Sequence, residues 1–105
     1  MPISAQASIK TTATGIITKI YAYDDCGSIH GVEGADIAVF FPTGLPQCAA
    51  GVWLSPAQPS YKTLTSFLLS AYSANISVRF QVYEDQLWAG TSSKLGKIDA
   101  VRLEK

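Results

Sequence analysis

Charged side chains are scarce in this sequence, since only 15% of its 105 residues are Asp, Glu, Lys or Arg. Eight basic residues balance eight acidic ones, and no stretch gathers more than two charges of like sign. Nucleic-acid binding requires a basic face that follows the phosphates. We therefore expect no nucleic-acid partner.

Long apolar runs are also missing. A membrane-spanning helix requires roughly 18 to 20 consecutive apolar residues, and no segment approaches that length. No Lys/Arg-rich amphipathic segment suited to a bilayer surface is present either. Because 48% of the residues are hydrophobic, we expect residues 1–105 to form one compact soluble domain without membrane insertion.

Side chains that perform catalysis or hold metals are few. His30 is the single histidine and follows Cys26 by four residues, but a thiol enzyme would show a helix that opens after the nucleophile, which Gly27 does not favour. Cys26, His30 and Cys48 would supply three zinc ligands where a structural site has four, and they lack C-x-x-C spacing. We expect no enzyme, no metal site and no cofactor.

Cys26 and Cys48 are the only cysteines. An even pair in a small, weakly charged domain is more typical of a disulfide in an exported protein than of two free thiols. The bridge would close a loop of roughly 20 residues and stabilise the fold by about 3 kcal/mol. We therefore predict a Cys26–Cys48 disulfide and a secreted protein.

The first half of the chain has the residue pattern of strands. Residues 15–23 are rich in β-branched and aromatic side chains and end at a turn cluster, Asp24 to Gly27. Residues 35–41 form a nearly continuous apolar run, which predicts a strand covered on both faces. Residues 49–54 predict another short strand.

A helix is predicted from Ser60, placed as the N-cap, to Asn75, which suits the C-terminal cap. Its opposite face is rich in Ser and Thr and could contact another subunit or simply be exposed. The predicted apolar stripe comprises Tyr61, Leu64, Phe67, Leu68, Ala71 and Tyr72, and the opposite face comprises Lys62, Thr63, Ser66, Ser70 and Ser73.

Strands return after the helix. Residues 76–83 alternate between apolar and polar side chains, which predicts a strand with one buried face. Residues 84–86 predict a tight hairpin turn into residues 87–89, and residues 97–103 predict the last strand. This order favours a mainly β fold, a five- to six-stranded, partly open Greek-key barrel with one helix plugging its end, which is the OB-fold.

Tyrosine and hydroxyl side chains remain as candidate ligand contacts. Aromatic faces pack against the C–H patches of sugars, and hydroxyl groups make directed hydrogen bonds, although Tyr and Thr are also ordinary strand residues. These side chains are Tyr21, Tyr23, Tyr83, Thr11, Thr12, Thr14, Thr18 and Ser77.

Several segments together resemble a known family. They are the stretch from Thr14 to Ile20, the Val52-Trp53 pair shortly after a cysteine, the helix from Ser60, and Ser77-Val78-Arg79-Phe80 leading to Leu87-Trp88. In this order and spacing they resemble the receptor-binding B subunits of subtilase cytotoxin and typhoid toxin, from about Thr14 to Trp88. The chain resembles a divergent member of these pentameric bacterial toxin B subunits.

The resemblance implies an OB-fold barrel that assembles into a homopentamer, lines a central pore with its helices and docks a separate catalytic toxin subunit. It further implies secretion through the bacterial periplasm and binding of sialylated or related host cell-surface glycans. The alternative is a secreted or periplasmic OB-fold protein that binds a protein partner and has no sugar site.

The resemblance also implies three glycan-binding residues. Thr14 stands where the relatives carry a serine that contacts the glycan, and it retains the hydroxyl. Glu33 belongs to a loop that flanks the site in the relatives, and Tyr83 lies at the end of the Val-Arg strand, offset by one residue. Cys48 matches a family cysteine in place, whereas Cys26 does not.

Overall fold

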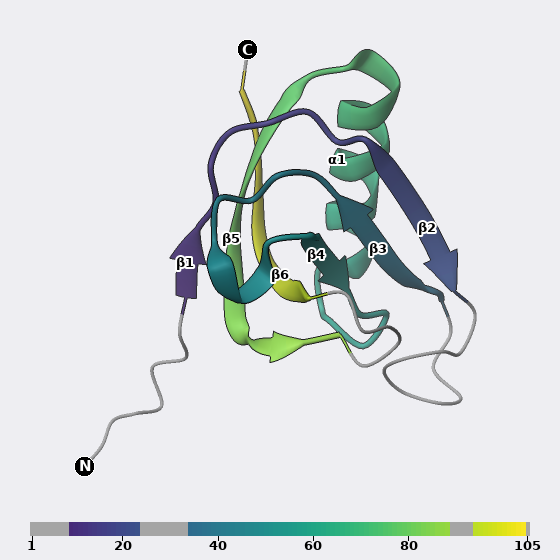
Figure 1. Cartoon of the computed structure of the whole chain (residues 1–105). Helices are drawn as coiled ribbons and strands as arrows, with labels where there is room; N and C mark the ends of the chain where they lie inside the picture. The colour runs from purple at the N-terminus through teal and green to yellow at the C-terminus, as the bar shows by residue number, and fades with distance from the viewer. Residues whose placement is uncertain (1–8, 24–33, 89–93, 105) are drawn as a thin grey trace.

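The computed structural model of the chain describes residues 9–23, 34–88 and 94–104. Within these ranges the protein is mainly β, with one α-helix (Figure 1). The elements are β1 (Ile9–Thr11), β2 (Lys19–Tyr23), β3 (Asp36–Phe40), the 3₁₀ turn η1 (Pro46–Cys48), β4 (Gly51–Leu54), α1 (Tyr61–Ala74), β5 (Ser77–Leu87) and β6 (Leu95–Glu104).

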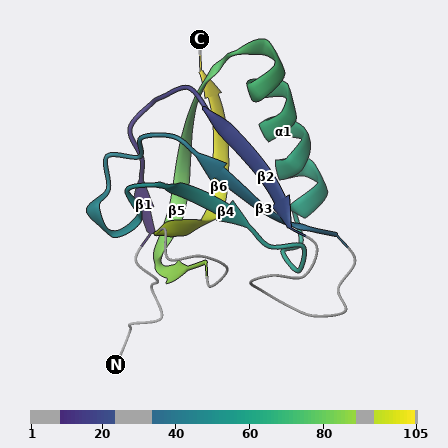
Figure 2. The same cartoon turned by 45° about the vertical axis from the view of Figure 1, so that its right-hand side comes forward.

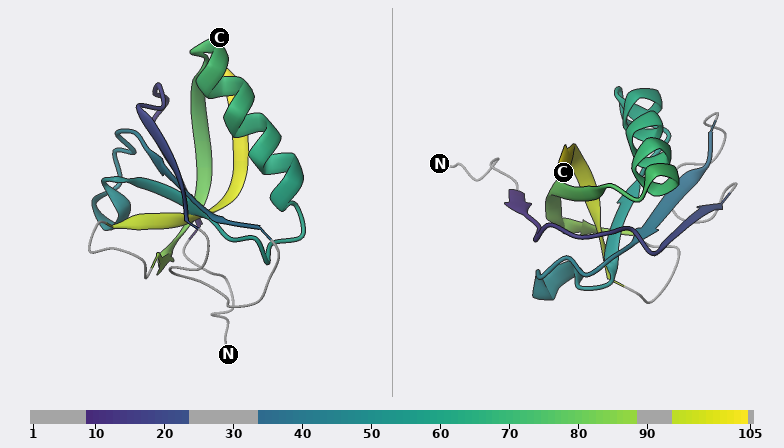
Figure 3. Two further views of the ribbon diagram at one scale, coloured as in Figure 1. Left: turned by 90° about the vertical axis from the view of Figure 1, so that its right-hand side faces the viewer. Right: turned by 90° about the horizontal axis from the view of Figure 1, so that it is seen from above.

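All six strands belong to one mixed sheet in the order β1-β5-β6-β4-β3-β2. Only β4 and β6 pair in parallel, and every other neighbouring pair is antiparallel. The sheet curls, and α1 lies alongside β5 and β6 (Figures 2 and 3). This six-stranded, one-helix arrangement confirms the predicted fold class and is consistent with an OB-fold. Among the described residues no pairing joins β1 to β2, so the barrel is open.

The core contains the inner face of β5. Val78, Phe80 and Val82 are fully buried, as their period of two predicts. Leu68 and Ala71 of α1 pack into the same cluster, so the helix covers this side of the sheet. β3 is buried on both faces from Asp36 to Val39, which confirms the expectation from its apolar run.

The helix begins and ends where the sequence predicts. Asn75 adopts a left-handed conformation with φ 58°, and its N–H bonds to the last carbonyls of the helix. Ser60 occupies the N-cap position but makes no side-chain capping bond. The predicted apolar stripe is too wide, because Phe67 and Tyr72 are 43% and 48% exposed and only Leu68 and Ala71 are buried.

Two boundaries in the first half differ from the prediction. β1 is an additional short strand that pairs with β5, and β2 begins at Lys19 rather than Gly15. Gly15 instead forms an isolated bridge with Val78 of β5, while Ile17 turns into the core. The first predicted strand is therefore divided between two edges of the sheet.

The predicted hairpin turn at residues 84–86 is wrong. β5 continues to Leu87, and the N–H of Trp88 bonds to the carbonyl oxygen of Leu95. Two indole groups hold this extension over the outer face of the sheet: Trp53 Nε1 donates to the Gln86 carbonyl at 2.9 Å, and Trp88 Nε1 donates to Asp36 Oδ2 at 3.0 Å. Burial of these tryptophans outweighs the local turn preference of the three polar residues.

Candidate functional site

The structure separates two of the predicted glycan-binding residues and leaves the third outside its described ranges. Thr14 lies beside the bridge between Gly15 and Val78, whereas Tyr83 pairs with Ile9 near the other end of β5. Glu33 lies outside the described residues. Thr14 and Tyr83 therefore belong to two distinct places on β5 and its neighbours.

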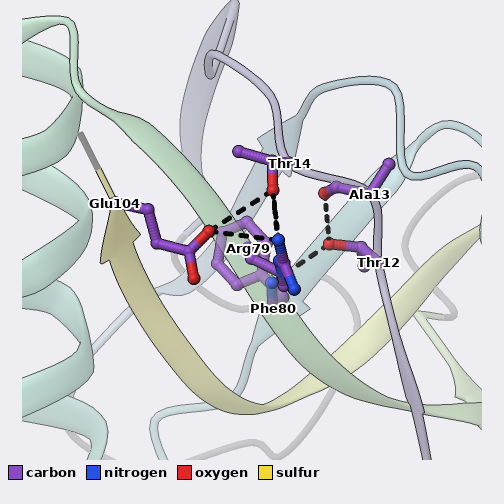
Figure 4. A network of polar contacts seen from close by, with 6 residues as sticks. All are labelled: Thr12, Ala13, Thr14, Arg79, Phe80 and Glu104. Atoms are coloured by element: carbon purple, nitrogen blue, oxygen red, sulfur yellow. Dashed lines mark hydrogen bonds and ion pairs between the residues drawn. The ribbon is translucent and has the colours of Figure 1, made fainter.

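Thr14 belongs to an exposed polar cluster with Arg79 and Glu104 (Figure 4). Arg79 Nε and Nη2 donate to Thr14 Oγ1 at 3.1 and 2.9 Å. Arg79 Nη2 also lies 3.3 Å from Glu104 Oε1, and the Thr14 hydroxyl donates to the same carboxylate oxygen at 3.4 Å. The hydroxyl that the resemblance assigns to a sugar thus holds the guanidinium in place.

The backbone around Thr14 is fixed on both sides. Gly15 exchanges two hydrogen bonds with Val78, at 2.8 and 2.9 Å. On the preceding side, the Thr12 hydroxyl accepts the Phe80 N–H at 3.0 Å and donates to the Ala13 carbonyl at 2.8 Å. These bonds attach the segment to β5, so Thr14 meets the outward-facing Arg79 (Figure 4).

Tyr83 is paired with a carboxylate. Its hydroxyl donates to Asp99 Oδ1 at 2.8 Å. Asp99 projects here because the β5–β6 register shifts: Gln81 pairs with Ala100 and Val82 with Ile98. The hydrogen bond to Asp99 raises the pKa of the Tyr83 phenol above its usual range, with smaller contributions from burial and from the carboxylate charge.

A cleft of about 370 Å³ adjoins this pair. It brings together the end of β5, the start of β6 and the chain that leads into α1. Its polar lining carries one ammonium, one carboxylate, a phenol, two amides and a hydroxyl, while a proline and a leucine supply apolar surface. The lining residues are Gln58, Pro59, Ser60, Leu64, Tyr83, Gln86, Lys97 and Asp99.

The cleft exists because two parallel strands diverge. β4 pairs with β6 only as far as Trp53 opposite Lys97, and the chain then turns away from β6 toward α1. Gln58 spans the resulting gap: Nε2 donates to the Ile98 carbonyl at 2.8 Å, and Oε1 accepts the Ser55 N–H at 2.9 Å. Both ends of this amide are engaged, so the wall of the cleft is fixed.

The sequence singled out Tyr83, which lines the cleft, but gave no indication of the other polar side chains there. Gln58, Gln86 and Lys97 stand in three separate segments that carry no shared motif, and Asp99 lies inside a predicted strand. The antiparallel β5–β6 pairing and the parallel β4–β6 pairing together bring these segments to one place. No local spacing could have indicated it.

Cys48 is fully buried and forms no disulfide with a described residue. Burial raises the pKa of this thiol and the charge of Glu84 adds to the effect, while a backbone bond from Gly96 and a bond from Thr43 oppose it. The predicted partner, Cys26, lies outside the described residues, so the disulfide stays a prediction. His30 lies outside them as well. Among the residues that the structure does describe, no three His, Cys, Asp or Glu side chains gather as metal ligands.

Comparison with known proteins assigns this chain to no family. No protein-family model matches the chain, and no curated protein matches its sequence at a significant level. In the described parts of the chain, no helix has both the length and the apolar character needed to cross a membrane.

Proposed function

We propose that the protein is a non-enzymatic, glycan-binding B subunit of a secreted bacterial AB-type toxin, which holds a sugar in the cleft at Tyr83 and delivers a separate catalytic subunit. The observation that supports the sugar site is the cleft itself, whose volume of about 370 Å³ lies in the range of small-molecule sites, at its lower end. The toxin assignment follows the family resemblance of the sequence.

The lining of the cleft suits a pyranose ring. Pro59 and Leu64 offer apolar surface to the C–H face of a sugar. Asp99, already oriented by Tyr83, accepts hydrogen bonds from hydroxyl groups, and Lys97 donates to them. The cleft is lined by one cation and one carboxylate, whose charges balance, so the electrostatic potential in the cleft is weak. A weak potential favours a hydroxyl-rich ligand over a polyanion.

The exposed side of α1 supports assembly into a ring of copies. Phe67, Leu69 and Tyr72 are 43%, 54% and 48% exposed, and the other exposed residues of the helix are mostly serine and threonine. A helix face with large apolar side chains and almost no charge is typical of a subunit contact. In this proposal five such helices line the pore of a homopentamer.

A glycan array tests the sugar site directly. We expect the wild-type protein to bind a subset of host-type glycans, and Asp99→Asn and Tyr83→Phe to weaken that binding about tenfold, as loss of one hydrogen bond involving a charged group does. Asp85→Asn and Tyr21→Phe are matched controls at exposed positions outside the cleft. An array without any bound glycan would contradict the proposal.

The alternative function, binding of a protein partner without a sugar site, is favoured by one observation. The exposed aromatic side chains Tyr21 and Tyr23 lie on β2, which is an edge strand of the sheet that the described residues form, and such an edge can accept a partner strand. An empty glycan array, together with a partner whose binding is lost in a Tyr21→Glu variant, would favour this second function.

A further inference from the structure

The outer face of β5 connects the two polar sites. Arg79, Gln81 and Tyr83 alternate with Val78, Phe80 and Val82, which are fully buried. The first three side chains therefore lie in one row on the outer face. Four residues of strand at about 3.3 Å each separate Arg79 from Tyr83 by about 13 Å.

In the middle of this row, the side chains on either side of Gln81 are small. Gln81 lies between Thr11 of β1 and Ala100 of β6, its direct cross-strand partners. Cross-strand partners share a face of the sheet, and both of these side chains are small. A ligand could therefore lie flat along the strand between the two ends without meeting a bulky side chain.

The two ends offer similar chemistry. At one end Arg79 supplies donors and Glu104 an acceptor, with the guanidinium oriented by Thr14. At the other end Lys97 supplies donors and Asp99 an acceptor. Each end thus has a carboxylate beside a cation, and the Arg79 end carries a second cation, Arg102, which is the cross-strand partner of Arg79. Such paired donors and acceptors suit neighbouring hydroxyl groups, which both donate and accept.

We propose that the site is an extended track that binds a linear oligosaccharide of about three sugar residues along β5. One ring occupies the Tyr83 cleft, and the far ring lies against the Arg79–Glu104 pair. The proposal rests on the glycan-binding function above and specifies its ligand as an oligosaccharide rather than a single sugar. Thr14 acts as a positioning residue, because it fixes the orientation of Arg79.

The separation of about 13 Å between Arg79 and Tyr83 along β5 favours an oligosaccharide over a single sugar. It exceeds one pyranose ring and matches about three linked rings, which the cleft alone, at about 370 Å³, is too small to enclose. A phosphate-rich chain is not favoured, because Arg79 already pairs with Glu104 and the Asp99 carboxylate at the other end would repel phosphate groups.

The test measures affinity against chain length. Galactose, lactose, lacto-N-triose and lacto-N-tetraose, with their sialylated counterparts, are titrated calorimetrically into the full chain. We expect the affinity to rise about tenfold or more from the monosaccharide to the trisaccharide, as one additional hydrogen bond to a charged group predicts, and then to level off. Equal affinity for the single sugar and the trisaccharide would overturn the track.

Variants at the Arg79 end and the Asp99 end of the track distinguish the extended track from the glycan-binding function itself. Arg79→Gln and Thr14→Val should remove the gain from chain length and leave monosaccharide binding unchanged, whereas Asp99→Asn should weaken every member of the series. Thr14→Ser keeps the hydroxyl and should restore the gain, and Lys19→Gln on β2 is the charge control. If no sugar binds, the glycan-binding function fails; if sugars bind but Arg79→Gln changes nothing, only the track fails.

Discussion

The Tyr83 hydroxyl donates a 2.8 Å hydrogen bond to Asp99 Oδ1 across the irregular β5–β6 pairing. This bond fixes the orientation of the one carboxylate that lines the cleft. It also makes the ionisation of Tyr83 a reporter on the cleft, because removal of the phenolic proton brings two negative groups together.

The first prediction concerns this ionisation. Because the hydrogen bond from Tyr83 to Asp99 raises the pKa of the phenol, Asp99→Asn should lower that pKa toward its ordinary value of 10.0. Tyrosinate absorbance is followed against pH, and subtraction of the Tyr83→Phe curve isolates this residue from the other four tyrosines. Unchanged titration in Asp99→Asn would show that the bond is not formed in solution.

The second prediction concerns the Cys48 thiol. A fully buried thiol with a raised pKa should react with a thiol reagent far more slowly in the native protein than in denaturant. The measurement uses Cys26→Ser, in which Cys48 is the only thiol. In the wild-type protein the same assay without reductant tests the disulfide: two reactive thiols after denaturation would exclude it, and none would establish it.

The raised Cys48 pKa also makes stability depend on pH. The folded state retains the thiol proton more strongly than the unfolded state, so this contribution is complete below the ordinary pKa of 9.0 and is lost as the pH rises above it. The free energy of unfolding of Cys26→Ser, measured in urea, should therefore fall more between neutral and alkaline pH than that of a Cys26→Ser, Cys48→Ala double variant. If the free energies of unfolding of the two proteins changed equally with pH, the raised pKa of Cys48 would be contradicted.

The third prediction tests the end of α1. Asn75 has φ 58°, a conformation that costs most residues about 1 kcal/mol and glycine almost nothing. Asn75→Ala should therefore lower the free energy of unfolding by about 1 kcal/mol, whereas Asn75→Gly should leave it nearly unchanged. Urea denaturation measures both, and equal losses in the two variants would argue against the left-handed cap.

The fourth prediction tests the exposed face of α1. Leu69 is 54% exposed, so Leu69→Glu should leave the protomer folded but dissociate a ring built on this face, because five like charges would meet at the pore. Native mass spectrometry distinguishes a pentamer from a monomer. Leu87→Glu, at a side chain that is 40% exposed on β5, is the matched control. A wild-type monomer at micromolar concentration would refute the ring.

Local patterning accounts for most of the secondary structure. The buried alternation of Val78, Phe80 and Val82 and the left-handed cap at Asn75 reflect interactions within a few residues, which the sequence displays directly. The prediction failed at residues 84–86, where contacts of Trp53 and Trp88 extend β5 through a segment with the composition of a turn. A local preference of this kind is weak compared with burial of two indole rings.

By itself, the sequence determined the class of the fold, the position of the helix and the buried face of β5, because steric preferences and hydrophobic periodicity act over short distances along the chain. Tertiary structure alone decided where the cleft lies. Lys97 meets Tyr83 because β5 pairs with β6, and Gln58 joins them because β4 pairs in parallel with β6 and then diverges from it. Strand pairing between segments distant in sequence leaves no periodic signal, so it becomes visible only once the chain has folded.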